Sequence, residues 1–299
     1  MIDKNKIVYT FKKSFHISYN QDYFCCVGSK VNLYNINNGE LVATFKDIKH
    51  PSFSKFTSNQ NLVVKSTTGS YHIYDLLSME LIKKIPPPKK VLGSTTDFQL
   101  TSDNKYIIDF SYVFPTNELM VIEIETGECT FFNLGYSRRG YIFSTEIDSK
   151  YYVVSVCAET IHAPDVSIRE FYELIYTSDK FELKEIYSDS YSKVSTVDYC
   201  FNKFALADYS NKIKIFNIHK NFHDEIEYSK AGVLYDLKIS KNGQFLALVE
   251  SRNIYVYDLN KKECIRNYEV EYGCFVDFFD NDTKLLIGTW KKGYCIALE

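Results

Sequence analysis

The chain lacks the residues on which several classes of enzyme depend. Its 299 residues include only 12 glycines, with no G-x-S-x-G elbow, no H-E-x-x-H pair and no phosphate-cradling glycine loop. These absences remove common signatures of serine hydrolases, zinc peptidases and nucleotide-binding enzymes. No apolar run approaches the roughly 20 residues that span a bilayer. The first residues, MIDKNKIVYTFKK, hold no signal-peptide core, so the sequence predicts a cytoplasmic protein.

The net charge and the cysteines indicate neither a nucleic-acid or membrane partner nor a metal or other cofactor. A net charge of −3 provides no overall field toward nucleic acid or an anionic membrane, so neither is an expected partner. The eight cysteines form no C-x-x-C pair, and most lie in apolar runs such as YFCCVG at 23–28. We expect reduced, packed thiols, and we predict no metal and no other cofactor.

A segment of about 40 residues recurs seven times along the chain. Each copy holds a strand, a turn and a strand, as in KVNLYNINNGELVATF at 30–45. The matching central positions are Tyr34, Tyr74, Ile122, Tyr176, Phe216, Tyr257 and Ala297, which are 40, 48, 54, 40, 41 and 40 residues apart. Repeats of this length made of short strands are the signature of a β-propeller.

Each repeat contains four strand signals. The second is the most apolar, as expected for a strand buried on both faces, and the fourth is the most polar, as expected at an edge. The fourth repeat places its first strand at 144–149. The seventh repeat has no fourth strand, and Ile7–Phe11 is an extra strand ahead of the first repeat. We therefore predict an all-β, seven-bladed propeller of four-stranded antiparallel blades over residues 1–299, a single domain whose ring is closed by the N-terminal strand.

The repeats resemble WD40 repeats over essentially the whole chain. The best matches are FALADYSNKIKIFNI at 204–218 and FLALVESRNIYVYDL at 245–259. The Trp-Asp dipeptide of that family is absent, and Tyr34-Asn35, Tyr74-Asp75, Phe216-Asn217 and Tyr257-Asp258 stand in its place. The resemblance implies that loops joining second and third strands share one face with loops joining successive blades.

Two loops on that face are predicted to be long, at 111–117 in the third repeat and 157–170 in the fourth. Long loops on a rigid frame concentrate binding residues, although they also drift in sequence without a function. Positive charge gathers nearby in PPPKK at 86–90 and SRRG at 137–140. The predicted partner-binding residues are Tyr112, Phe114, His162, Arg169, Arg138, Arg139, Lys89 and Lys90.

The SRRG segment also suggests an anion site. It is similar to the Arg-Arg-Gly motif of the phosphoinositide-binding propellers called PROPPINs, which implies contact of Arg138 and Arg139 with an anionic lipid. Forked arginine donors suit phosphate recognition. Ordinary solvated charge is the competing interpretation of the same residues.

A second set of residues comes from aligning the first strands on their turns. One position then reads His16, Ser54, Asp97, Ser144, Asp198, Asp236 and Asp277. Because the first strand is innermost, we expect His16, Asp97, Asp198, Asp236 and Asp277 to ring the central channel. Such a ring could bind a cation or a basic peptide, or its members could bond to the backbone of the neighbouring blade.

Taken together, the sequence predicts a non-enzymatic interaction propeller. It is expected to hold a protein or peptide on the face that bears the third and fourth extensions. The alternatives are a propeller hydrolase or lactonase that uses the channel carboxylates, and a module that binds anions or phosphoinositides through Arg138 and Arg139. The oligomeric state is left open.

Overall fold

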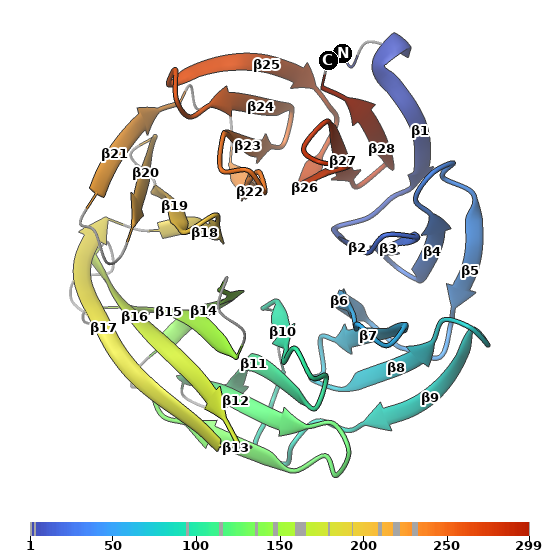
Figure 1. The fold of residues 1–299 in the computed structure, drawn as a ribbon, viewed down its shortest axis with the longest axis vertical. Helices are drawn as coiled ribbons and strands as arrows, with labels where there is room; N and C mark the ends of the chain where they lie inside the picture. The colour runs from blue at the N-terminus through green and yellow to red at the C-terminus, as the bar shows by residue number, and fades with distance from the viewer. Residues whose placement is uncertain are drawn as a thin grey trace.

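The strands form seven four-stranded sheets that stand as blades around a central axis (Figure 1). The computed structural model describes residues 2, 4–93, 96–113, 116–134, 137–145, 149–158, 166–178, 180–192, 194–208, 211–217, 222–228 and 233–298. In six of the sheets the strands follow chain order from the axis outward, and neighbours pair antiparallel. The predicted seven-bladed β-propeller is confirmed.

The first four blades contain strands β2 to β17. Their bounds are β2 (His16–Tyr19), β3 (Tyr23–Val27), β4 (Val31–Asn35), β5 (Leu41–Phe45), β6 (Pro51–Phe56), β7 (Asn61–Ser66), β8 (Tyr71–Asp75), β9 (Glu80–Ile85), β10 (Phe98–Leu100), β11 (Tyr106–Val113), β12 (Thr116–Glu123), β13 (Cys129–Phe132), β14 (Ser137–Ser144), β15 (Lys150–Ala158), β16 (Val166–Thr177) and β17 (Lys180–Ser192).

The last three blades contain strands β18 to β28 and the N-terminal strand β1. Their bounds are β18 (Val194–Cys200), β19 (Lys203–Asp208), β20 (Lys212–Asn217), β21 (Phe222–Glu227), β22 (Leu234–Ile239), β23 (Phe245–Glu250), β24 (Asn253–Asp258), β25 (Glu263–Glu269), β26 (Gly273–Phe279), β27 (Lys284–Thr289), β28 (Lys292–Ala297) and β1 (Ile7–Lys12). A single 3₁₀ turn, η1 (Lys4–Lys6), precedes β1.

The core lies between consecutive blades rather than inside any one of them. Along β7, Leu62 and Val64 pack in the cluster shared with blade one, whereas Val63 packs in the cluster shared with blade three. All three side chains are fully buried. Because successive side chains of a strand point to opposite faces, a strand sandwiched between two sheets must be apolar at every position. This explains the apolar second strand of each repeat.

The N-terminal strand closes the ring as predicted. Strand β1 pairs antiparallel with β28, with Ile7 opposite Ile296 and Lys12 opposite Lys292. The sheet order is therefore β1-β28-β27-β26. A Cβ atom added to Gly293 would lie 1.8 Å from the ring of Phe11, so only glycine allows that ring to cover β28.

Blades three and four differ from the prediction in two ways. The expected loop at 111–117 is mostly paired strand, since β11 runs to Val113 and β12 begins at Thr116. The expected loop at 157–170 is likewise shortened by β15 and β16. In addition, SRRG lies in β14 rather than in a loop, which moves the first strand of blade four upstream of 144–149. In all three segments continued backbone pairing overrides the polar side chains that suggested loops.

The outer strands of blades one and two expose apolar side chains. Leu41 and Val42 on β5, and Leu81 and Ile82 on β9, are exposed, with 55% of Ile82 accessible to solvent. The edge of blade one is therefore less polar than predicted, whereas β9 in blade two combines its apolar residues with three charged ones, as ELIKKI shows.

Candidate functional site

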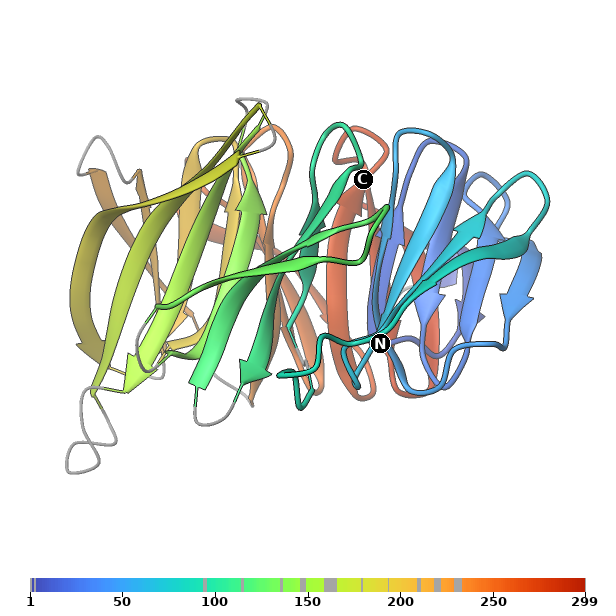
Figure 2. The ribbon, with the colours of Figure 1, turned by 90° about the horizontal axis from the view of Figure 1, so that it is seen from below.

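The connections after each second strand and between successive blades share one side of the ring, which we call the loop face (lower edge of Figure 2). Four of the predicted partner-binding residues of blades three and four belong to strands that end at this face. Tyr112 is in β11, Arg138 and Arg139 are in β14, and Arg169 is in β16. The structure describes the backbone of these four residues but not their side chains, and Phe114 and His162 lie outside the described residues altogether.

Lys89 and Lys90 lie in the connection between blades two and three, and both are exposed. The Lys90 ammonium is 5.8 Å from the centroid of the Phe131 ring on the outer strand β13. The structure therefore places Lys90 at the periphery of the loop face, away from the channel.

The predicted channel residues do face the neighbouring blade from the innermost strands, but they occupy two levels instead of one. His16 pairs with Val27 and Asp236 with Val249, and both partners are the fifth residue of their strand. Asp97 precedes Phe98 at the same level. Asp198 and Asp277 lie two residues nearer the turn, opposite Ala205 and Leu286. The prediction that all five residues lie at one level of the channel is therefore wrong. A shift of two residues along a strand leaves a side chain on the same face, so the sequence pattern is the same for both levels.

Most of these side chains bond to the backbone of the next blade. His16 Nε2 lies 3.1 Å from the Ser54 carbonyl oxygen. The Ile239 amide donates to Asp198 Oδ2 at 2.8 Å, and the Val276 amide donates to Asp236 Oδ2 at 3.3 Å. Gln99 Nε2 adds a bond of 3.0 Å to the Ile142 carbonyl. These polar groups therefore hold consecutive blades together at the channel wall.

Two lysines complete the charged part of the channel. Lys55 forms an ion pair of 2.7 Å with Asp97, and Lys238 one of 3.2 Å with Asp198. Burial opposes the charged form of Lys238, yet Asp198, Asp236 and Asp277 raise its pKa. Within the described residues, no group of three His, Cys, Asp or Glu side chains is arranged to hold a metal ion.

The protonation of the channel groups follows from their burial. Burial raises the pKa of Asp236 to about 7 and that of Asp277 to about 6, against the opposing charge of Lys238. Burial also lowers the pKa of His16 to about 4, where the ring lies between Phe53 and Phe275. His16 is therefore neutral at physiological pH, and its Nε2 proton is donated to the Ser54 carbonyl.

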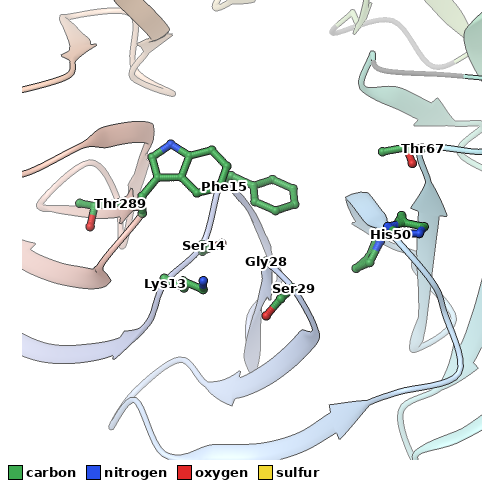
Figure 3. A pocket seen from close by; sticks show the side chains of 10 residues that line it. Lys13, Ser14, Phe15, Gly28, Ser29, His50, Thr67 and Thr289 are labelled. Atoms are coloured by element: carbon green, nitrogen blue, oxygen red, sulfur yellow. The ribbon is translucent and has the colours of Figure 1, made fainter.

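A pocket of about 410 Å³ opens where blades seven, one and two meet (Figure 3). It is formed by the β1–β2 connection at 13–15, the β3–β4 loop at 28–29, the β5–β6 connection at 50–51, Thr67 and the β27–β28 loop at 289–290. All of these segments belong to the loop face. Phe15 and Thr289 line one side, and His50 and Thr67 line the opposite side.

One wall of this pocket is aromatic. The ring of Phe15 lies 5.8 Å from that of Trp290, and 57% of Trp290 is exposed. Tyr272 is next to Trp290 on the adjoining connection, accepts a hydrogen bond of 3.1 Å from the Trp290 amide through its carbonyl, and is 58% exposed. Large aromatic side chains are usually buried in a folded protein, so exposed rings beside a pocket indicate a contact surface.

The loops around the pocket are held in place by hydrogen bonds. The Ser14 hydroxyl donates to the carbonyls of His16 and Val27, and the Thr289 hydroxyl donates to the Lys292 carbonyl. The Ser14 carbonyl would lie 2.6 Å from a Cβ atom added to Gly288, so this close approach requires glycine. The pocket is therefore preformed.

Trp290 is not among the partner-binding residues predicted from the sequence. The structure shows that it is exposed on the loop face. The available signal was its position immediately after the apolar second strand KLLIGT, where the chain must leave the core and the repeat continues with two lysines.

The fold and the loop face define a β-propeller of the kind that usually presents binding residues on its loops. No protein-family model matches the chain. The chain is 22% identical over 193 residues to the putative BTB/POZ domain-containing protein L788 of Acanthamoeba polyphaga mimivirus. The match covers 64% of this chain and 36% of that protein. In the described residues, no helix is long and apolar enough to cross a membrane.

Proposed function

We propose that the propeller is a non-enzymatic interaction module that holds a protein or peptide on its loop face. The observation that carries this proposal is the preformed pocket of about 410 Å³ beside the exposed Trp290. Aromatic side chains in such positions commonly supply much of the binding energy of an interface. A rigid site also avoids part of the entropy lost when loops become ordered.

The residues of blades three and four form the second part of the proposed surface. The partner would be contacted by six residues of these blades, whose strands extend toward the loop face. They are Tyr112, Phe114, His162, Arg169, Arg138 and Arg139. Lys89 and Lys90 would add positive charge at its border. Arginine and aromatic residues are the usual anchors of such contacts.

The test is affinity purification of a partner from the native host lysate, followed by reconstitution with the purified partner. We expect Trp290→Ala, and the combined change Arg138→Glu and Arg139→Glu, to weaken binding by at least about tenfold without lowering the melting temperature. Leu77→Ala is the matched control, because Leu77 is 80% exposed in the β8–β9 turn on the opposite face. Unchanged affinity in both variants would refute the proposal.

A channel hydrolase is the second candidate, and the pKa values of Asp236 and Asp277 favour it. Carboxyls that titrate near neutrality suit general acid–base catalysis. Asp236→Asn and Asp277→Asn should then abolish turnover while the fold stays intact. The bond from the Val276 amide to Asp236 favours the structural interpretation, and unchanged turnover would exclude the hydrolase. Anion binding through Arg138 and Arg139 would be detected by flotation with phosphoinositide liposomes.

A further inference from the structure

The pocket between blades seven, one and two lies in a strongly basic part of an acidic protein. Lys13 lines it, and exposed lysines stand on the strands and loops around it. These are Lys12, Lys30, Lys46, Lys49 and Lys292. Nearby acidic residues are Asp47 and Glu271, and Glu271 is already bonded to Lys291. The chain as a whole has a net charge of −3, so this surplus of positive charge is local.

The Lys13 and His50 side chains that line the pocket are available to a ligand. Within the residues that the structure describes, no ion pair joins Lys13 or His50 to a carboxylate. His50 also adopts a left-handed backbone conformation, with φ at 52°, immediately before Pro51. Such a conformation is costly for a residue with a side chain, and it persists where the surrounding structure imposes it. The loop is therefore fixed with the imidazole at the pocket.

The lining itself is mostly uncharged. Phe15, Pro51 and Trp290 present apolar surface, whereas Lys13 and His50 carry the ionisable groups of the lining. A phosphate backbone would need several cations in direct contact along its path, but among the described residues Lys13 is the one lysine of the lining and the other lysines stand around the pocket. A peptide needs one apolar anchor and a few flanking charges, which is what this arrangement offers.

We infer that this pocket binds an acidic peptide segment. A large apolar side chain of the segment enters against Phe15 and Trp290, and flanking Asp or Glu carboxylates contact Lys13 and His50. This inference rests on the proposed function, because it names the chemistry of the partner that the loop face would hold. The exposed lysines around the pocket add long-range attraction, which speeds association and weakens with salt.

Trp290 makes the pocket directly observable, because it is the only tryptophan in the chain. We expect iodide to quench its fluorescence more strongly than caesium, since the surrounding positive charge concentrates anions. Lys13→Glu should reduce this difference, whereas Lys261→Glu, in the β24–β25 turn of the opposite face, should not. Equal or stronger quenching by caesium in the wild type would overturn the electrostatic part of the inference.

The ligand class is tested with a displayed library of random short peptides, selected on the immobilised full chain. The selected peptides should be enriched in Asp and Glu around one large apolar residue, and they should shift the emission of Trp290 to shorter wavelength. Trp290→Ala and Lys13→Glu should each weaken them by at least about tenfold, while Leu77→Ala and Lys261→Glu should not.

Four results would overturn the inference, and they bear differently on the proposed function. Peptides without acidic bias, or peptides that bind Trp290→Ala unchanged but lose binding to the Arg138 and Arg139 double variant, would leave the interaction module standing. If no peptide is enriched, the peptide-binding pocket is refuted, and the proposed interaction module is then tested by the affinity purification of a partner alone. Tighter binding of a uridine oligonucleotide than of the selected peptides would refute both.

Discussion

At the scale of single residues, an unexpected ion pair lies buried between blades two and three. Lys65 of β7 and Asp109 of β11 are both fully buried, with the Lys65 ammonium 2.6 Å from the Asp109 carboxylate. The Tyr71 hydroxyl also donates to Asp109, and the Lys65 ammonium donates to the Thr96 carbonyl at 2.7 Å. Burial lowers the pKa of Lys65 and raises that of Asp109, so each group depends on the other for its charge.

We predict that Lys65→Met destabilises the protein by about 3–5 kcal/mol, because it leaves Asp109 charged or protonated without its partner. The double variant with Asp109→Leu should recover much of this loss, since two apolar side chains can replace a buried pair. Urea unfolding of the wild type, both single variants and the double variant measures the coupling. Additive losses would show that the pair is not a unit.

The channel carboxyls predict a dependence of stability on pH. The folded state raises the pKa of Asp236 and Asp277 above the unfolded value of 3.8, so it favours their protonated forms. The stability that these groups contribute is therefore complete below the unfolded pKa of 3.8, and it is lost progressively as the pH rises from there to the folded values of about 6 and 7.

We accordingly predict that Asp236→Asn raises the melting temperature more at pH 8 than at pH 5, because only part of this stability has been lost at pH 5. Asparagine can still accept the bond from the Val276 amide and cannot become charged. A gain of about 1 kcal/mol would appear as a shift of roughly 2–4 °C by differential scanning calorimetry. A gain that is equal at both pH values would contradict the assignment of a raised pKa.

At the scale of elements, strand β1 is the part of the propeller whose removal is most informative. It covers the edge of β28 through five paired positions between Ile7 and Lys12, and Phe11 is buried in the cluster between blades seven and one. Its loss would expose an unpaired strand edge and open the ring.

Deleting residues 1–12 should therefore lower the melting temperature far more than deleting residues 1–3. We expect a fall of at least about 5 °C, or loss of a cooperative transition. A synthetic peptide of residues 4–13, added in trans, should restore part of the loss by adding the missing strand. Equal melting temperatures for the two deletions would show that β1 does not secure the ring.

Strands were predicted well where burial of their side chains determines the sequence, and poorly where backbone pairing with a neighbouring strand extends them. The second strands were found because both of their faces are buried, which leaves an apolar run such as FLALVE. Strand β14 was missed because Arg138, Arg139 and Gly140 suggest a turn. A Cβ atom at Gly140 would lie 2.1 Å from the Phe110 ring, so this glycine is needed for the approach of blade four to blade three.

At the scale of the whole molecule, seven repeats and an orphan strand were enough to predict the ring and its closure. The residue-level sites were harder to predict. The charge pair of Lys65 and Asp109 joins strands 44 residues apart, and nothing in either strand alone marks the other as its partner. The pocket at Trp290 combines five segments from three blades, so its existence depends on ring closure rather than on any local pattern.

The pairing of β1 with β28 also has a consequence for how the protein is made. Ile7 leaves the ribosome long before its partner Ile296, because the two residues are far apart in the chain. Blades one to six can each form once their four strands have emerged, whereas blade seven must wait for β28 while β1 remains unpaired. Closure of the ring therefore comes after the other six blades can form, and a nascent chain that has not yet reached β28 presents β1 as an open strand for other proteins to bind.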